Sequence, residues 1–185
     1  MAGERAWVET VKADLREALP GKNISIETGH RLPYALNVSG YLRKNNKAVF
    51  EEPFKYQTDL LIVENAVEGD NWVPRVVVEF KLGVVTTHDA LTYSAKAATH
   101  KSVHPYLRYG IIVGGFNGPV PKRILRHGSQ FDFMMTLASE ALTKVERTKL
   151  VRLLKQEIKA SRTISALISE KSDIRLLHRR LMVSY

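Results

Sequence analysis

A chain of 185 residues can bury one substantial core, and its net charge of +9 at pH 7 predicts an acidic partner such as nucleic acid. The absence of cysteine excludes disulfides, thiol catalysis and cysteine-ligated zinc. The start of the chain lacks an apolar signal region and no stretch has the apolar length of a membrane span, so we expect a soluble intracellular protein.

The N-terminal part of the chain predicts a helix followed by an early strand. Residues 5–19 carry apolar side chains at helical spacing and end at a Pro-Gly pair, which is typical of a helix terminus. Residues 24–32 begin with an alternating pattern that predicts a strand. Residues 37–46 contain Gly40, Asn45 and Asn46 and predict a loop or an irregular hairpin. Its cations Arg43 and Lys44 either reach a DNA groove or are solvated, and we favour solvation.

Two runs in the middle of the chain predict strands that pair with each other. Residues 56–63 and 73–82 are rich in β-branched and aromatic side chains. The segment between them contains Asn65, Gly69, Asp70 and Asn71, which tolerate turn geometry. We therefore expect an antiparallel hairpin.

Three polar side chains on these strands carry the prediction of chemistry. Asp59 lies in the first run, and Glu79 and Lys81 lie in the second, where period-two alternation puts both on the face opposite Phe80. Carboxylates are hard oxygen ligands that suit Mg²⁺. A lysine beside them can orient the attacking water or offset charge on a phosphate during in-line displacement. The pattern therefore predicts phosphodiester hydrolysis.

The order Thr58-Asp59, then Glu79-Phe80-Lys81, resembles the PD-(D/E)xK nuclease superfamily, which includes type II restriction endonucleases, junction resolvases and repair nucleases. The resemblance implies that Asp59 and Glu79 hold the metal, that the Phe80 carbonyl adds a ligand, and that Lys81 serves the water. Thr58 departs from the pattern, because it stands where the name-giving proline would be. Members of the superfamily often lack that proline.

Further acidic residues enter as candidate ligands. Nuclease folds of this superfamily often carry a glutamate on the first helix that faces the metal, and Glu9 and Glu17 are the two candidates here. Glu52 lies close enough to the predicted hairpin in sequence to be another candidate. For each of the three, a charge that simply faces solvent is the favoured alternative.

Residues 87–103 predict a helix that crosses back over the sheet. Its start, from Asp89 to Tyr93, is similar to the Gln-x-x-x-Tyr motif of some nucleases in the superfamily, with aspartate replacing glutamine. Lys96, His100 and Lys101 lie within about two turns, so we expect one helix face either to contact DNA phosphates or to be solvated.

The remaining elements complete an α/β fold class. Residues 109–115 and 131–135 predict two more strands, and the order strand, helix, strand implies a mixed central β-sheet flanked by helices, the restriction-endonuclease-like architecture. Beyond residue 136, apolar side chains at helical spacing predict two helical segments, the second over residues 164–181. We therefore expect a nuclease core at 1–135 and a basic helical extension at 136–185 packed on the same domain. Residues 144–180 carry much of the excess charge, so they either hold DNA or form ordinary solvated faces.

The sequence thus predicts a Mg²⁺-dependent endonuclease, with Mn²⁺ able to substitute, that cleaves double-stranded DNA in the manner of a restriction enzyme. The resemblance also implies a homodimer and a prokaryotic or phage protein, and the lack of a signal region and of a membrane span predicts a cytoplasmic protein with no membrane partner. The alternatives are a structure-selective junction or repair nuclease and a non-catalytic DNA-binding module with the same fold. A binder of RNA or of a membrane surface is the less favoured class.

Overall fold

The computed structural model describes residues 2–19, 21, 23–169 and 177. Within this part of the chain the helices are α1 (Ala2–Ala18), α2 (Thr87–Val103), α3 (Lys122–His127) and α4 (Lys144–Ser169). The central sheet contains β1 (Ile24–Thr28), β6 (Leu60–Asn65), β7 (Trp72–Leu82), β8 (Arg108–Gly114) and β9 (Phe133–Thr136). Two small two-stranded sheets pair β2 (Arg31–Ala35) with β5 (Phe54–Gln57) and β3 (Val38–Tyr41) with β4 (Ala48–Phe50).

The central sheet is mixed, as predicted. Its strand order is β1-β6-β7-β8-β9, antiparallel from β1 to β7 and parallel from β7 to β9. The predicted hairpin is confirmed, with Leu60 opposite Val78 at the end of the β6–β7 pairing. Strand β7 is buried from Val76 to Phe80, as expected for a central strand covered on both faces.

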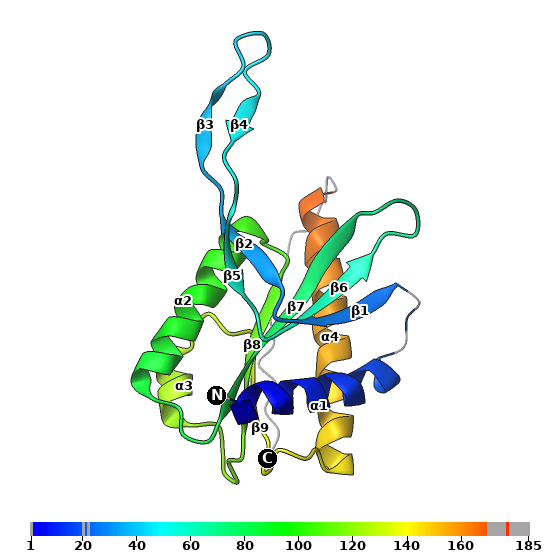
Figure 1. The fold of residues 1–185 in the computed structure, drawn as a ribbon, viewed down its shortest axis with the longest axis vertical. Coiled ribbons are helices and arrows are strands. Elements are labelled where there is room, and N and C mark those ends of the chain that lie inside the picture. Colours follow the sequence, from blue (N-terminus) through cyan, green and yellow to red (C-terminus); the bar gives the residue numbers. More distant parts are fainter. Residues whose placement is uncertain (1, 20, 22, 170–176, 178–185) are drawn as a thin grey trace.

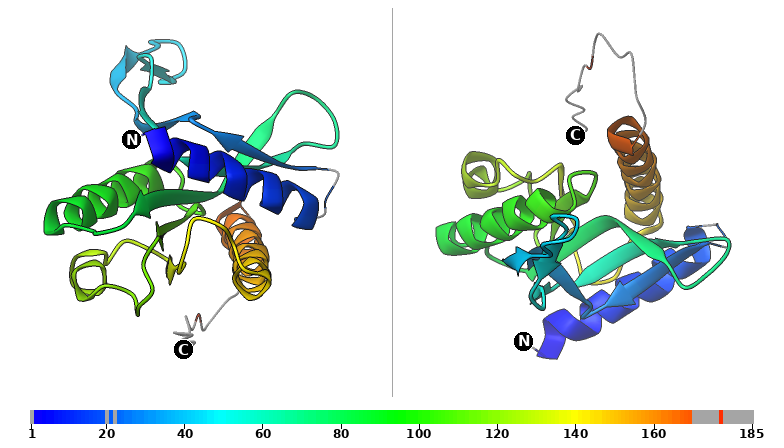
Figure 2. Two further views of the ribbon diagram at one scale, coloured as in Figure 1. Left: turned by 60° about the horizontal axis from the view of Figure 1, so that its bottom comes forward. Right: turned by 90° about the horizontal axis from the view of Figure 1, so that it is seen from above.

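Helices cover both faces of this sheet (Figure 1, Figure 2). Helices α1 and α4 share one core with Val76, Val78 and Phe80, where the Trp7 ring meets the Phe80 ring edge to face at 5.0 Å. Helix α2 covers the opposite face, which carries Val77. Because α4 inserts Leu150, Leu154 and Ile158 into the α1 core, the C-terminal helix packs directly on the sheet.

Some predicted boundaries are corrected. Helix α1 begins at Ala2 rather than at residue 5. The predicted strand at 24–32 is two strands, because Gly29 turns the chain with a φ of +66°. In place of two C-terminal helical segments, α4 continues unbroken to Ser169, and the rest of the predicted second segment lies outside the described residues.

The segment predicted as a loop or irregular hairpin contributes to the β3–β4 hairpin, which projects from the body (Figure 1). Its pairing shifts register between Val38 and Gly40, which is the irregularity of a bulge. Among the described residues no helix is both long and apolar enough to cross a membrane.

Candidate active site

The candidate site lies at the C-terminal end of β7, just beyond the point where β6 stops pairing with it. Asp59, immediately before β6, accepts the Phe80 N–H through Oδ2 at 2.8 Å. Two residues later on the same edge of β7, the Leu82 N–H donates to Oε2 of Glu4 at 3.0 Å. The N–H and C=O of one strand residue point to the same side, so the Phe80 carbonyl faces the edge between these carboxylates. The Asp59 carboxylate and the Phe80 backbone therefore lie together at this edge of β7.

Glu79 lies on the α2 side of β7 and is almost fully buried, with 1% of its surface exposed. Its Oε1 lies 2.9 Å from the Lys96 Nζ and also accepts a hydrogen bond from the Tyr109 hydroxyl. Burial raises the pKa of Glu79 to about 7, with a further rise from the Asp59 charge, while Lys96 and Tyr109 oppose that rise. The carboxyl is therefore close to half-ionised at neutral pH.

Several acidic side chains lie close enough to the hydroxyl of Tyr93, on α2, to raise its pKa. Burial is the main cause that raises the pKa of Tyr93, and four carboxylates add to it in the order Glu79, Asp59, Glu4 and Asp89. Each negative charge disfavours a phenolate close by. Carboxylates from the sheet, α1 and α2 therefore all lie near the Tyr93 hydroxyl at the end of β7.

Two lysines flank this acidic region at different depths. Lys81 is about a quarter exposed, and its Nζ lies 3.7 Å from Asp89 Oδ1. Lys96 reaches inward to Glu79, donates to the Gln57 carbonyl at 3.2 Å and lies 5.4 Å from the centre of the Tyr93 ring. The lysine predicted to contact DNA thus neutralises the buried carboxylate instead.

The structure does not present Lys96, His100 and Lys101 as one exposed face of α2, and for His100 both predicted alternatives, phosphate contact and solvation, are wrong. His100 is fully buried, its Nδ1–H donates to the Pro33 carbonyl at 3.1 Å, and burial lowers its pKa to about 4. Lys101 pairs with Asp132 at 2.8 Å, whereas Lys96 pairs with Glu79. The side chains of Lys96, His100 and Lys101 therefore point to three different environments, and neutral His100 cannot contact a phosphate from the core.

The three acidic candidates from the sequence contact groups away from the end of β7, whereas Glu4, on the same helix as Glu9 and Glu17, lies beside it. Glu9 contacts Lys12 and Thr28, Glu17 pairs with Arg147 at 2.9 Å, and Glu52 pairs with Lys55 at 3.5 Å. Glu9 is five residues from Glu4, which is about 140° around the helix. Because the predicted helix began at residue 5, it left out Glu4. The missed signal is that Glu4 precedes the buried stripe of Val8, Val11 and Leu15 by one turn.

The donor set fits Mg²⁺ when part of the coordination comes from water and substrate. Within the described residues no three His, Asp or Glu side chains form a ready metal-binding group. Mg²⁺ commonly takes one or two carboxylates and completes its shell with waters and phosphate oxygens. Oδ1 of Asp59 and Oε2 of Glu79 accept no hydrogen bond from the described part of the chain, so both oxygens are available as ligands.

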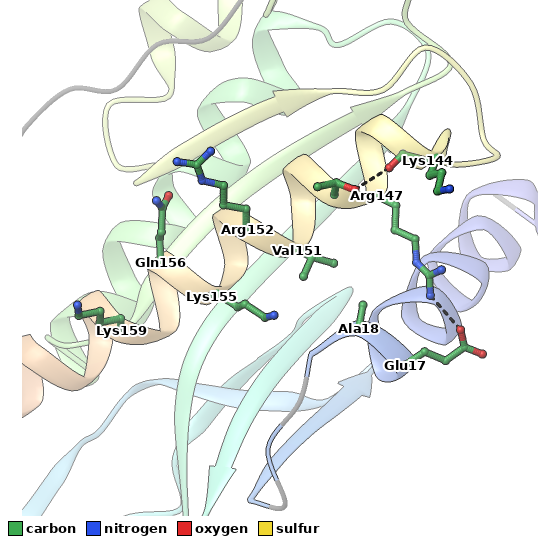
Figure 3. A pocket seen from close by; sticks show the side chains of 10 residues that line it. Glu17, Ala18, Lys144, Arg147, Val151, Arg152, Lys155, Gln156 and Lys159 are labelled. Atoms are coloured by element: carbon green, nitrogen blue, oxygen red, sulfur yellow. Dashed lines mark hydrogen bonds and ion pairs between the residues drawn. The ribbon is translucent and has the colours of Figure 1, made fainter.

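A second surface, the basic groove, runs between the end of α1 and residues 144–159 of α4 (Figure 3). It is an open depression of about 850 Å³ whose floor includes Ala18 and Val151. Among the described residues that line it, Glu17 is the single acid, and it is paired with Arg147. Glu17 is thirteen positions after Glu4 along α1, at about 1.5 Å per position, so the groove begins about 20 Å from the acidic side chains at the end of β7. Its cations are Lys144, Arg147, Arg152, Lys155 and Lys159.

Comparison with known proteins adds no family or relative to these observations. A scan against protein-family models finds no match, and a search of curated proteins finds none either.

Proposed function

We propose that this protein is a Mg²⁺-dependent endonuclease that hydrolyses phosphodiester bonds of double-stranded DNA. The observation that carries the proposal is the convergence of Asp59, Glu79 and Glu4 at the end of β7, with Lys81 and Lys96 beside them. Carboxylates gathered against their mutual repulsion need a cation to be stable when ionised. Their placement agrees with what the resemblance to the PD-(D/E)xK superfamily implies for Asp59 and Glu79.

The proposed role of each side chain follows from how deeply it is buried. Asp59 and Glu79 would hold Mg²⁺, which when bound polarises a phosphate oxygen and lowers the pKa of a bound water. The Lys96 ammonium limits the rise in pKa that burial causes in Glu79, and so keeps that carboxyl available in its ionised form near neutral pH. Lys81, held near Asp89 and partly exposed, can offset the negative charge that builds on the phosphate.

The basic groove supports DNA as the substrate. Of the described residues that line it, five are cations and Glu17 is paired with one of them, Arg147, which leaves four cations for a run of backbone phosphates. Duplex DNA carries a charge about every 1.7 Å along its axis. A duplex that reaches from the acidic site to the groove, about 20 Å away along α1, would therefore present several phosphates to these side chains.

The test is incubation of the purified protein with plasmid, phage DNA and a four-way junction, in Mg²⁺ and in EDTA, alongside Lys81→Ala. Discrete fragments that need Mg²⁺ and Lys81 would support restriction-type cleavage. Preferential cutting of the junction would favour the structure-selective nuclease. Binding to DNA without hydrolysis in Mg²⁺ or Mn²⁺ would refute the enzyme and select the binding module.

We also propose that the protein acts as a homodimer, since cleavage of both strands is commonly shared between two copies. Light scattering at working concentration tests the dimer. A mass equal to one chain would contradict it without affecting the proposed chemistry.

A further inference from the structure

The arm formed by residues 36–54 has no place in the proposed chemistry. Strands β3 and β4 pair only with each other and do not join the central sheet, and the hairpin stands away from the body (Figure 1). An isolated two-stranded ribbon is only marginally stable in water. A ribbon that gains little from the core and still projects into solvent is typical of a contact element.

The arm exposes an unusual amount of apolar surface. Seven of its large apolar side chains are between 40% and 67% exposed, and they follow one another along a single hairpin. A single exposed apolar residue needs no explanation, but seven on one projecting arm, with Val38 opposite Phe50 in the β3–β4 pairing, favour a contact surface. These residues are Leu36, Val38, Tyr41, Leu42, Val49, Phe50 and Phe54.

The tip of the arm identifies the chemistry of its partner. Residues 42–47 read Leu-Arg-Lys-Asn-Asn-Lys, with three cations, two amides and no acid, and all six are exposed. The turn is fixed, since Oδ1 of Asn45 accepts the Lys47 N–H at 3.1 Å and Asn46 adopts a φ of +54°. Arginine, lysine and asparagine are the side chains that read base edges and bind phosphates. A second copy of this chain would present an equally cationic tip, so the charge favours a polyanion over a dimer contact.

The base of the arm is fixed beside the acidic site. Tyr56 of β5 stacks on Tyr34 of β2 with 3.7 Å between ring centres, and the next residue, Gln57, accepts a hydrogen bond from Lys96. From Phe54 to Lys47 the chain extends seven residues, or about 23 Å at about 3.3 Å each. A duplex held at the acidic site is therefore within reach of the tip.

We propose that the arm enters the major groove of duplex DNA beside the phosphate being cleaved. Arg43, Lys44 and Lys47 contact phosphates and base edges, while Tyr41 and Leu42 contact apolar groups such as thymine methyls. A two-stranded ribbon fits this groove, which is about 12 Å wide. That the partner is DNA rests on the proposed function. Binding of the arm to DNA does not require that the protein hydrolyse it.

The test measures binding in EDTA, by fluorescence anisotropy of a labelled duplex at several salt concentrations. The variant Arg43→Gln/Lys44→Gln/Lys47→Gln should bind about tenfold or more weakly, and its slope of log affinity against log salt should fall by about 2 to 3. The control variant removes the same number of charges from exposed residues outside the arm, the site and the groove: Arg16→Gln/Lys122→Gln/Arg126→Gln. Its loss of affinity should be smaller.

The wild-type protein should also protect guanine N7, which lies in the major groove, from methylation. Equal losses in the two triple variants, or no loss in the arm variant, would overturn the proposal, as would an arm variant that changes the oligomeric mass of the protein. If the wild type binds through the arm and never hydrolyses DNA, the enzyme fails and the arm contact stands. If hydrolysis and affinity both survive the arm substitutions, the arm contact fails and the enzyme stands.

Discussion

Replacing Glu79 with glutamine should stabilise the protein at pH 8. Burial raises the pKa of this carboxyl from 4.5 to about 7, so the folded protein holds the proton more tightly than the unfolded chain. The stability that this proton contributes is complete below about pH 4.5 and is lost as the pH rises through about 7. At about 1.4 kcal/mol per pKa unit, ionising Glu79 in the fold costs about 3 kcal/mol.

Glutamine tests this cost because it keeps the atom that Glu79 uses. Lys96 and Tyr109 both bond to Oε1, and an amide oxygen can accept from both, whereas it does not titrate. Urea unfolding of wild type and Glu79→Gln at pH 5 and pH 8 gives four free energies of unfolding. Between pH 5 and pH 8 the difference in free energy of unfolding between variant and wild type should change by about 2.5 kcal/mol in favour of the variant, because the unfolded wild-type carboxyl is already mostly ionised at pH 5. A difference that stays constant would refute the burial argument. Mg²⁺ at pH 8 should stabilise the wild type alone.

Three further outcomes follow from the same geometry. Lys96→Met removes the cation that holds down the pKa of buried Glu79, so the acidic limb of the hydrolysis pH profile should move to higher pH. A limb that does not move would show that the ion pair with Lys96 does not control the ionisation of Glu79. Gly114→Ala places a methyl 2.4 Å from the Trp7 ring and should cost about 1–3 kcal/mol in urea unfolding, while Gly3→Ala, with open space around it, should not destabilise. In the basic groove, a triple variant should lower the salt slope of DNA binding by about 2 to 3, and an unchanged slope would exclude the groove from DNA contact: Arg152→Gln/Lys155→Gln/Lys159→Gln.

The central strands could be predicted because their pattern is unambiguous. In β7 the period-two alternation separates the face of Glu79 from the face of Phe80, and burial on both sides of the strand follows from its uninterrupted apolar run. The turn between β6 and β7 places the start of β6 beside the end of β7, so the proximity of Asp59 and Glu79 could be predicted from the sequence. The bounds of α2, 87–103, were predicted as the structure has them.

The depth of side chains in the site could not be predicted from the same pattern. Helix α2 buries Ala90, Ser94 and Ala97, and such small residues let a helix lie close to a sheet. That approach brings Lys96 to Glu79 and buries His100, although spacing along the helix is equally compatible with a solvated face. Glu4 was missed for a different reason, because helix ends are the least certain part of a sequence-based assignment and one more turn placed it at the site.

The most direct test of the central claim is the Mg²⁺-dependent hydrolysis rate of wild type, Asp59→Asn and Glu4→Gln, with Glu9→Gln as the matched control on the same helix. We predict that EDTA abolishes cleavage, that Asp59→Asn loses at least about 100-fold, and that Glu4→Gln loses activity while Glu9→Gln does not. Cleavage that survives Asp59→Asn or EDTA would contradict a metal-dependent site at the end of β7.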